Sequence, residues 1–212
     1  MAARPPTVLS GAIVGAHLAA IRDARSADPA VRRSARVLGT LAVAEALRGL
    51  ETVDGEVTTP VAPARVTRPA RRLTLVPVLR AGLVLLEPAL DLLPPGTRVG
   101  FMGLSRDERT LQPHTYLESL PADLASDEVV LLEVMIATGG SSVAALRALR
   151  AAGAERLHLV GLIAAPEGLA AVAAAHPEVP ITVAAIDERL DERGYIVPGL
   201  GDAGDRLYSE PG

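Results

Sequence analysis

Short apolar runs alternate with longer mixed segments from Leu73 to the end of the chain. The runs read LTLVPVL, VVLLEVM, LHLVGLIAAP and ITVAAID, and each is bounded by Gly, Pro or polar turn residues. Segments with helical patterning, each of roughly ten residues, separate them at 83–93, 141–154 and 167–177. Strands buried on both faces read as continuous apolar runs, and their alternation with helices is typical of a parallel sheet. The pattern predicts an α/β fold, with a mostly parallel sheet flanked by helices.

The first part of the chain has a different pattern. Residues 6–50 predict two helices, the first ending near Arg25 and the second spanning residues 31–49. Residues 51–72 are strand-like and irregular, because three prolines interrupt them. Residues 101–116 predict an extended hairpin arm that could close over a site. We expect a single domain over residues 1–212, with an N-terminal segment of residues 1–72 and a core of residues 73–212.

Composition narrows the class of protein. Apolar residues make up 49% of the 212 residues, whereas aromatics make up 2%, so a sizeable core must consist of Ala, Val, Leu and Ile. The net charge of −4 argues against a broad nucleic-acid surface, and no apolar run approaches the length of a membrane span. All basic residues are arginines and cysteine is absent, which excludes Schiff-base lysines and thiolate sites. The segment TVLSGAIVGAHLAAI resembles a signal peptide only loosely, so we expect a helix there and a cytoplasmic protein.

The segment VVLLEVMIATGGSS combines a strand with a glycine turn. Gly139 and Gly140 allow the backbone to turn tightly and to approach a ligand, and Ser141 and Ser142 are expected to cap the next helix. Free amides at the start of that helix favour an anion. The loop is shorter than a Walker loop and lacks its lysine, so it suits a single terminal phosphate. The alternative is an ordinary strand–turn–helix connection.

An acid, Glu133, lies at the end of the same strand. In parallel sheets, ligands bind beyond the carboxyl ends of the strands. A carboxylate next to a bound phosphate would accept hydrogen bonds from sugar hydroxyls, so the pair indicates a phosphorylated ribose. In the alternative, Glu133 points to solvent and residues 138–141 alone bind a phosphate.

Arginines stand at two further strand ends. Arg80 follows the apolar run in VPVLRAG and lies beside Gly82, and Arg106 lies in GLSRDERTL. Two guanidinium groups can bind a diphosphate through paired hydrogen bonds. The alternative for each is an ordinary solvated arginine, which is our interpretation of Arg109.

The C-terminal segment YIVPGLGDAGDR is rich in turn residues. One proline and three glycines make a loop that presents main-chain amides and carbonyls, which suits the edge of a small planar base. Asp202 and Asp205 could hold a metal-bound water or an arginine such as Arg206. The alternative is a structural turn. No His, Asp or Glu group has metal-ligand spacing; we interpret His158 and His176 as structural and leave His17 and His114 unassigned.

Six segments together resemble the uracil phosphoribosyltransferase family. They are VPVLRAGL, GLSRDERTLQP, MIATGGSS, GLIAAPEGL, HPEV and DERLDERGYIVPGLGDAGDRLY, and they run in order from Val76 to Tyr208. The resemblance implies a type I phosphoribosyltransferase-like fold and transfer of phosphoribose from 5-phosphoribosyl 1-diphosphate (PRPP) to uracil, which gives UMP and diphosphate. It also implies Mg²⁺ and a homodimer or higher homo-oligomer, and it makes GTP a candidate effector, while the sequence does not decide whether GTP regulates the protein. Composition adds the expectation of no nucleic-acid or membrane partner.

The resemblance also assigns site residues. Those that fall on PRPP contacts are Arg80, Arg106, Glu133, Met135, Ala137, Thr138, Gly139, Gly140, Ser141 and Asp202. Those that fall on the uracil site are Tyr195, Ile196, Gly201, Asp202 and Ala203. Residues 138–141 would surround the 5-phosphate, and Asp202 could also contact the metal. No residue is assigned as a nucleophile.

The chain departs from the family where it has Glu133-Val134 instead of Asp-Pro and Ser105 instead of a tyrosine. Glutamate is one methylene longer than aspartate, so its carboxylate can reach the ribose hydroxyls differently. This departure favours an alternative function, a weakly active or non-catalytic relative that binds nucleotide or PRPP in a regulatory role. Transfer to another base is a third hypothesis, against which the retained YIVPGLGDAGD argues.

Overall fold

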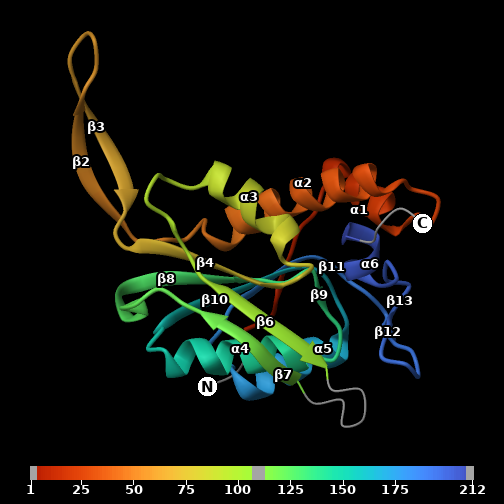
Figure 1. The fold of residues 1–212 in the computed structure, drawn as a ribbon. Coiled ribbons are helices and arrows are strands. Elements are labelled where there is room, and N and C mark those ends of the chain that lie inside the picture. The colour runs from red at the N-terminus through yellow and green to blue at the C-terminus, as the bar shows by residue number, and fades with distance from the viewer. Residues whose placement is uncertain (1–3, 107–112, 209–212) are drawn as a thin grey trace.

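The computed structural model describes residues 4–106 and 113–208 and contains a central sheet. Its longer strands are β4 (Arg72–Leu79), β6 (Phe101–Arg106), β7 (Pro113–Ser119), β8 (Asp127–Leu132), β10 (Arg156–Ala164) and β11 (Ile181–Ile186). Short strands β1 (Thr7–Val8), β5 (Arg98–Val99) and β9 (Met135–Ile136) extend it. The order is β1-β11-β10-β8-β4-β6-β7, and every pair in it is parallel except β6–β7 (Figure 1). The predicted mostly parallel sheet is confirmed.

Helices cover both faces of this sheet (Figure 1). Helices α1 (Ala12–Arg22), α2 (Asp28–Ala46) and α3 (Leu83–Leu92) lie on one face, and α4 (Gly140–Ala151) and α5 (Pro166–Ala175) lie on the other. Successive strand residues point to opposite faces of the sheet. Leu132 therefore packs with Leu38 and Leu85 in the core under α1–α3, and Leu131 packs with Leu146 in the core under α4 and α5. All five side chains are fully buried. No helix among the described residues is long and apolar enough to cross a membrane.

Both N-terminal helices end earlier than the sequence predicts. Helix α1 ends at Arg22 rather than near Arg25, because Asp23 is extended and its carboxylate accepts the Arg25 backbone N–H at 2.9 Å. Helix α2 spans Asp28–Ala46 rather than residues 31–49, because Pro29 fits the first helical turn, where its missing N–H costs nothing. Strand β1 was expected to be helical but pairs with β11 instead.

Three hairpins are present among the described residues, the shortest of which joins β12 (Arg189–Leu190) to β13 (Ile196–Val197). The expected one consists of β6 and β7, but its tip at residues 107–112, with Arg109, lies outside the described residues. The segment expected to be irregular forms a regular antiparallel pair of β2 (Thr52–Thr58) and β3 (Pro63–Pro69). This second hairpin extends away from the sheet (Figure 1). Prolines are tolerated at its strand ends, where fewer ladder hydrogen bonds are lost.

The strand that begins as β8 is interrupted before it continues as β9. Glu133 and Val134 lie at the interruption, and β8 and β9 both pair with β10. The Val134 carbonyl accepts the backbone N–H groups of Leu162 and Ile163 at 3.0 and 3.1 Å. The main chain is therefore held to β10 on both sides of the acid, which places Glu133 at a defined point of the sheet edge.

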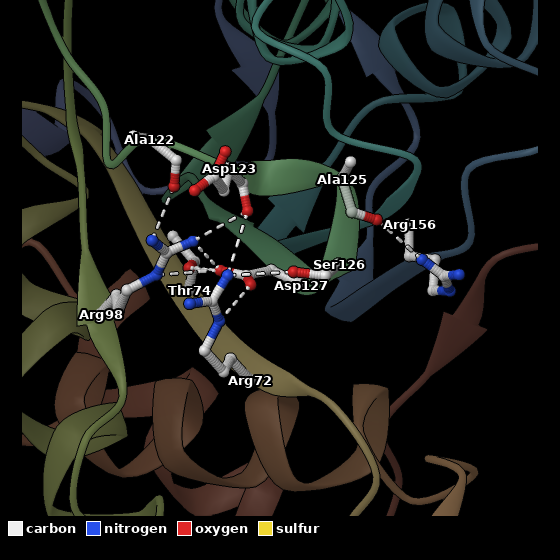
Figure 2. Close-up of polar contacts among 9 residues, drawn as sticks. All are labelled: Arg72, Thr74, Arg98, Ala122, Asp123, Ala125, Ser126, Asp127 and Arg156. Carbon is white, nitrogen blue, oxygen red and sulfur yellow. Dashed lines mark hydrogen bonds and ion pairs between the residues drawn. The ribbon is translucent and has the colours of Figure 1, made fainter.

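A buried acid connects β4, β5 and β8 at the opposite end of the sheet from the carboxyl ends, where the parallel strands begin (Figure 2). Asp127 has no exposed surface and accepts hydrogen bonds from Arg72, Thr74 and Arg98, with both Nε–O distances at 3.0 Å. Burial alone would raise the pKa of Asp127, but the hydrogen bonds from Thr74, Arg98 and Arg72 outweigh it and hold the pKa below 3.8. The network joins β4, β5 and β8 far from the carboxyl ends of the strands.

Candidate functional site

Three segments meet at the carboxyl ends of β4, β8–β9 and β11. They are the RAG turn after β4, residues 133–141 (the 133–141 loop) and residues 195–203 (the 195–203 loop). A Cβ on Gly82 would lie 2.6 Å from the Leu132 carbonyl oxygen, so the RAG turn rests directly on the end of β8. A Cβ on Gly204 would lie 3.7 Å from a guanidinium nitrogen of Arg80. Arg80 therefore extends from β4 to the end of the 195–203 loop.

The 133–141 loop has a backbone that only glycine permits at one position. Gly139 has φ +79°, and a Cβ there would lie 2.6 Å from the Gly168 carbonyl oxygen. A Cβ on Gly168 would in turn lie 2.3 Å from the Ala137 carbonyl oxygen. These two glycines let the loop lie against the start of α5. Sequence reasoning missed Gly168, although the segment GLIAAPEGL contains it.

The start of α4 can bind an anion, but its serines do not cap the helix as predicted. Gly139 is the N-cap residue and has no side-chain capping hydrogen bond, so the expected capping by Ser141 and Ser142 is wrong. The Gly140 N–H contacts the Thr138 hydroxyl at 3.5 Å, and the first turn contains no acidic residue. The first amides of a helix lack partners within it, so they can bind a phosphate.

Glu133 is partly buried and its carboxylate accepts a hydrogen bond from the Ser142 hydroxyl. The alternative in which Glu133 points to solvent is therefore wrong. Burial raises the pKa of Glu133 to about 7, and the hydrogen bond from Ser142 opposes that rise. Sequence reasoning missed the contact, because Ser142 lies nine positions further along the chain. The site contains an acid that changes charge near neutral pH.

The raised pKa of Glu133 predicts that the ionised side chain lowers the free energy of unfolding above neutral pH. The folded state holds this proton more tightly than the unfolded chain, so stability falls as the pH rises from 4.5 towards about 7. A Glu133→Gln variant is expected to exceed the wild type in unfolding free energy by up to about 3 kcal/mol at pH 8, and by much less at pH 4. Urea denaturation at the two pH values measures this. Replacing the exposed Glu192 by Gln is the control, and a pH-independent difference for Glu133→Gln would contradict the account.

The structure describes the side chain of Arg80 but not that of Arg106, the second predicted diphosphate ligand. Arg80 is exposed at the end of β4, and within the described residues its guanidinium makes no hydrogen bond or ion pair. It is available to an anionic ligand. Arg106 is the last residue of β6, and its side chain lies outside the description. The paired arginines therefore stay a prediction, as does closure of residues 101–116 over the site.

The 195–203 loop combines buried and exposed residues. Ile196, in β13 (Ile196–Val197), and Ala203, which begins α6 (Ala203–Tyr208), are buried, whereas Tyr195 is exposed. Gly201 has φ +81°, a conformation that side chains disfavour. The Asp202 carboxylate accepts the Asp205 N–H at 3.0 Å and so caps α6. A buried residue near each end and the cap at α6 therefore anchor the loop.

Arg206 does not pair with the loop carboxylates as the sequence suggested. Its guanidinium donates instead to the carbonyl oxygens of Ile21 and Asp23, at 2.8 Å each, and of Leu200 at 3.2 Å. This leaves the Asp202 side chain facing the Gly204 side of the loop, where Arg80 also lies.

The histidines fit structural roles. The rings of His17 and His176 contact Ser34 and the Val143 carbonyl at 3.1 and 3.4 Å, and burial lowers the pKa of His158. Across residues 4–106 and 113–208, no group of three or more His, Cys, Asp or Glu side chains could hold a metal ion.

The sheet order and the loops at its carboxyl edge define the type I phosphoribosyltransferase fold. A hypoxanthine-guanine phosphoribosyltransferase from Bacillus anthracis superposes with a TM-score of 0.51 at 12% identity, over 76% of this chain and 80% of that one. The AQ2163 protein of Aquifex aeolicus superposes with a TM-score of 0.91 at 38% identity, over 97% and 98% of the two chains.

Within that class of fold, sequence comparison identifies the family. The model of the uracil phosphoribosyltransferase family matches residues 8–209. The uracil phosphoribosyltransferase of Thermus thermophilus is 47% identical over 203 residues, which cover 95% of this chain and 97% of that protein. The chain belongs to the uracil phosphoribosyltransferase family.

Proposed function

We propose that this protein transfers phosphoribose from PRPP to uracil, giving UMP and diphosphate. Family membership supports the activity, since the uracil phosphoribosyltransferases of Thermus thermophilus and Kineococcus radiotolerans are 47% and 48% identical to this chain. One structural observation carries it: Arg80 extends from the RAG turn, which rests on the end of β8, to Gly204 at the end of the 195–203 loop. A ligand bound at this edge can contact all three segments.

Each segment has one role in the proposal. The amides of the 133–141 loop and the start of α4 bind the 5-phosphate. Glu133 accepts hydrogen bonds from the ribose hydroxyls in place of its hydrogen bond from Ser142. Arg80 and Arg106 bind the diphosphate. The 195–203 loop binds the edge of uracil through main-chain groups. Mg²⁺ would be held chiefly by the diphosphate of PRPP, with Asp202 as the nearest acid of the loop, and it would neutralise charge on the leaving group.

The reaction follows from this placement. The bond from the anomeric carbon to the diphosphate oxygen breaks, a bond to a uracil nitrogen forms, and that nitrogen loses its proton. The transition state has oxocarbenium character, as in glycoside cleavage. The site segments supply no nucleophile pair, so direct transfer is favoured over a covalent intermediate. Positioning and charge stabilisation then account for catalysis, with Glu133 next to the developing positive charge.

This role for Glu133 predicts the effect of removing its charge. Glu133→Gln is expected to lower the turnover of UMP formation at pH 8 by about ten- to a thousandfold, the scale of one transition-state contact. The double change Glu133→Asp, Val134→Pro is expected to keep or raise turnover. Proline at position 134 keeps the carbonyl that accepts the N–H groups of Leu162 and Ile163. Steady-state rates of both variants, with Glu192→Gln as the control, measure this; equal rates for the wild type and Glu133→Gln would exclude Glu133 from the reaction.

A panel of bases tests the function against its alternatives. The protein is incubated with PRPP, Mg²⁺ and either uracil, cytosine, adenine or hypoxanthine, and the nucleotides are separated. The proposal expects UMP alone. A different nucleotide would indicate another base, and binding of PRPP without any product would indicate the non-catalytic role, which no relative favours. A cytoplasmic homo-oligomer stays a prediction, and GTP stays a candidate effector.

A further inference from the structure

A buried ion pair joins the end of α1 to the end of β11. Arg22, the last residue of α1, donates from its two terminal nitrogens to the two carboxylate oxygens of Asp187, at 2.8 and 2.5 Å. The Asp187 side chain is 4% exposed and that of Arg22 is 25% exposed. Paired hydrogen bonds of this kind hold both groups in one orientation. The pair lies outside every segment assigned to substrate.

Both members of the pair also bind the main chain of Gly199. The Asp187 carboxylate accepts the Gly199 N–H at 2.8 Å, and Arg22 donates to the Gly199 carbonyl at 3.1 Å. Gly199 has φ +60°, and a Cβ there would lie 2.1 Å from the Ile196 carbonyl oxygen, so no other residue fits. The peptide groups on both sides of Gly199 are therefore fixed in direction.

The end of α1 also contacts the loop through Arg206. That side chain donates to the carbonyls of Ile21 and Asp23 at the end of α1 and to Leu200 in the loop. The last carbonyls of a helix need partners from outside it, and here Arg206 supplies them. The same elements line a hollow of about 490 Å³ next to the loop. The end of α1 is thus attached to the 195–203 loop through two separate arginines.

We propose that Arg22 and Asp187 are positioning residues for base recognition, an inference that rests on the proposed function. The loop reads uracil through main-chain groups, so their direction decides how well the base binds. The pair fixes that direction at Gly199, between Ile196 and Gly201. The 133–141 loop is held separately, by Gly168 and the start of α4. Loss of the pair therefore weakens the binding of uracil much more than the binding of PRPP, because all assigned PRPP contacts except Asp202 lie outside the 195–203 loop.

Three variants test this proposal. Arg22→Lys keeps the charge but cannot bind Asp187 and Gly199 together, and Asp187→Asn keeps the shape without the charge. Arg25→Ala is the matched control, because Arg25 forms an exposed pair with Asp23 just beyond the same helix. For each we measure the KM for uracil, the Kd for PRPP by calorimetry, and the unfolding temperature. Arg22→Lys and Asp187→Asn are expected to raise the KM for uracil by about ten- to a hundredfold, the scale of one lost charge-assisted hydrogen bond. Their Kd for PRPP should change by less than about threefold.

The outcomes separate this proposal from the function on which it rests. A wild-type protein that forms no UMP overturns both. If the wild type is active and the folded Arg22→Lys variant keeps the wild-type KM for uracil, the positioning role alone is overturned. Equal losses of uracil and PRPP binding, or variants that do not fold, would give the pair a general structural role and overturn the proposal as well.

Discussion

An Arg80→Ala variant is expected to bind PRPP about thirtyfold to a few thousandfold more weakly than the wild type. The guanidinium of Arg80 is exposed at the site edge and, in the described part of the chain, has no partner of its own. In the complex it would pair with diphosphate oxygens. Removing one member of such a charge-assisted contact leaves the other unpaired and costs about 2–5 kcal/mol, and each 1.4 kcal/mol is tenfold in Kd.

Calorimetric titration with PRPP and Mg²⁺ measures the Arg80 effect. Arg80→Lys keeps a positive charge without paired donors, so it should bind PRPP with an affinity between those of wild type and Arg80→Ala. Arg65→Ala removes an exposed arginine of β3 and controls for the general change in charge. An unchanged Kd for Arg80→Ala would remove Arg80 from the site.

The second large effect is expected on stability. Asp127→Asn should lower the free energy of unfolding by about 3–5 kcal/mol, because it leaves the guanidinium groups of Arg72 and Arg98 without their buried carboxylate. Since the folded pKa of Asp127 is depressed, its contribution is present above pH 3.8 and is lost as the pH falls through the folded value. The difference between variant and wild type should therefore shrink in acid.

Urea denaturation at pH 7 and at pH 3 tests the Asp127 network. Asp123→Asn is the matched control: Asp123 is exposed, and its contact with Arg72 and Arg98 uses the backbone carbonyl, which the substitution keeps. Turnover per folded protein should stay unchanged, because the network lies at the opposite edge of the sheet from the site. A wild-type stability for Asp127→Asn at pH 7 would show that the network adds nothing.

Sequence patterns predict the core of this fold well for a physical reason. The strands β4, β8, β10 and β11 are buried on both faces, so each reads as a largely continuous apolar run that polar residues, glycine or proline bound. The site edge follows from the same pattern, since the unusual residues stand where these runs end. The bounds of α1 and α2 could not be predicted as closely, because local contacts such as Asp23 with Arg25 decide them.

The remaining features depend on contacts between distant parts of the chain. Strand β1 exists only because β11 lies beside it. Gly168 is needed only because the 133–141 loop packs on it. Arg22 and Asp187 are 165 positions apart, and no local pattern marks either as a partner of Gly199. The roles of such residues can be recognised only once the sheet order has placed their elements side by side.

The formation of UMP by the purified wild-type protein tests the central claim most directly. Labelled uracil, PRPP and Mg²⁺ are incubated with the protein at pH 8, and labelled UMP is counted against the amount of protein. The account predicts many UMP molecules per protein chain, and none when PRPP is left out. PRPP binding with no labelled UMP would contradict it, because a site with this geometry would then bind the substrate without transferring its phosphoribose.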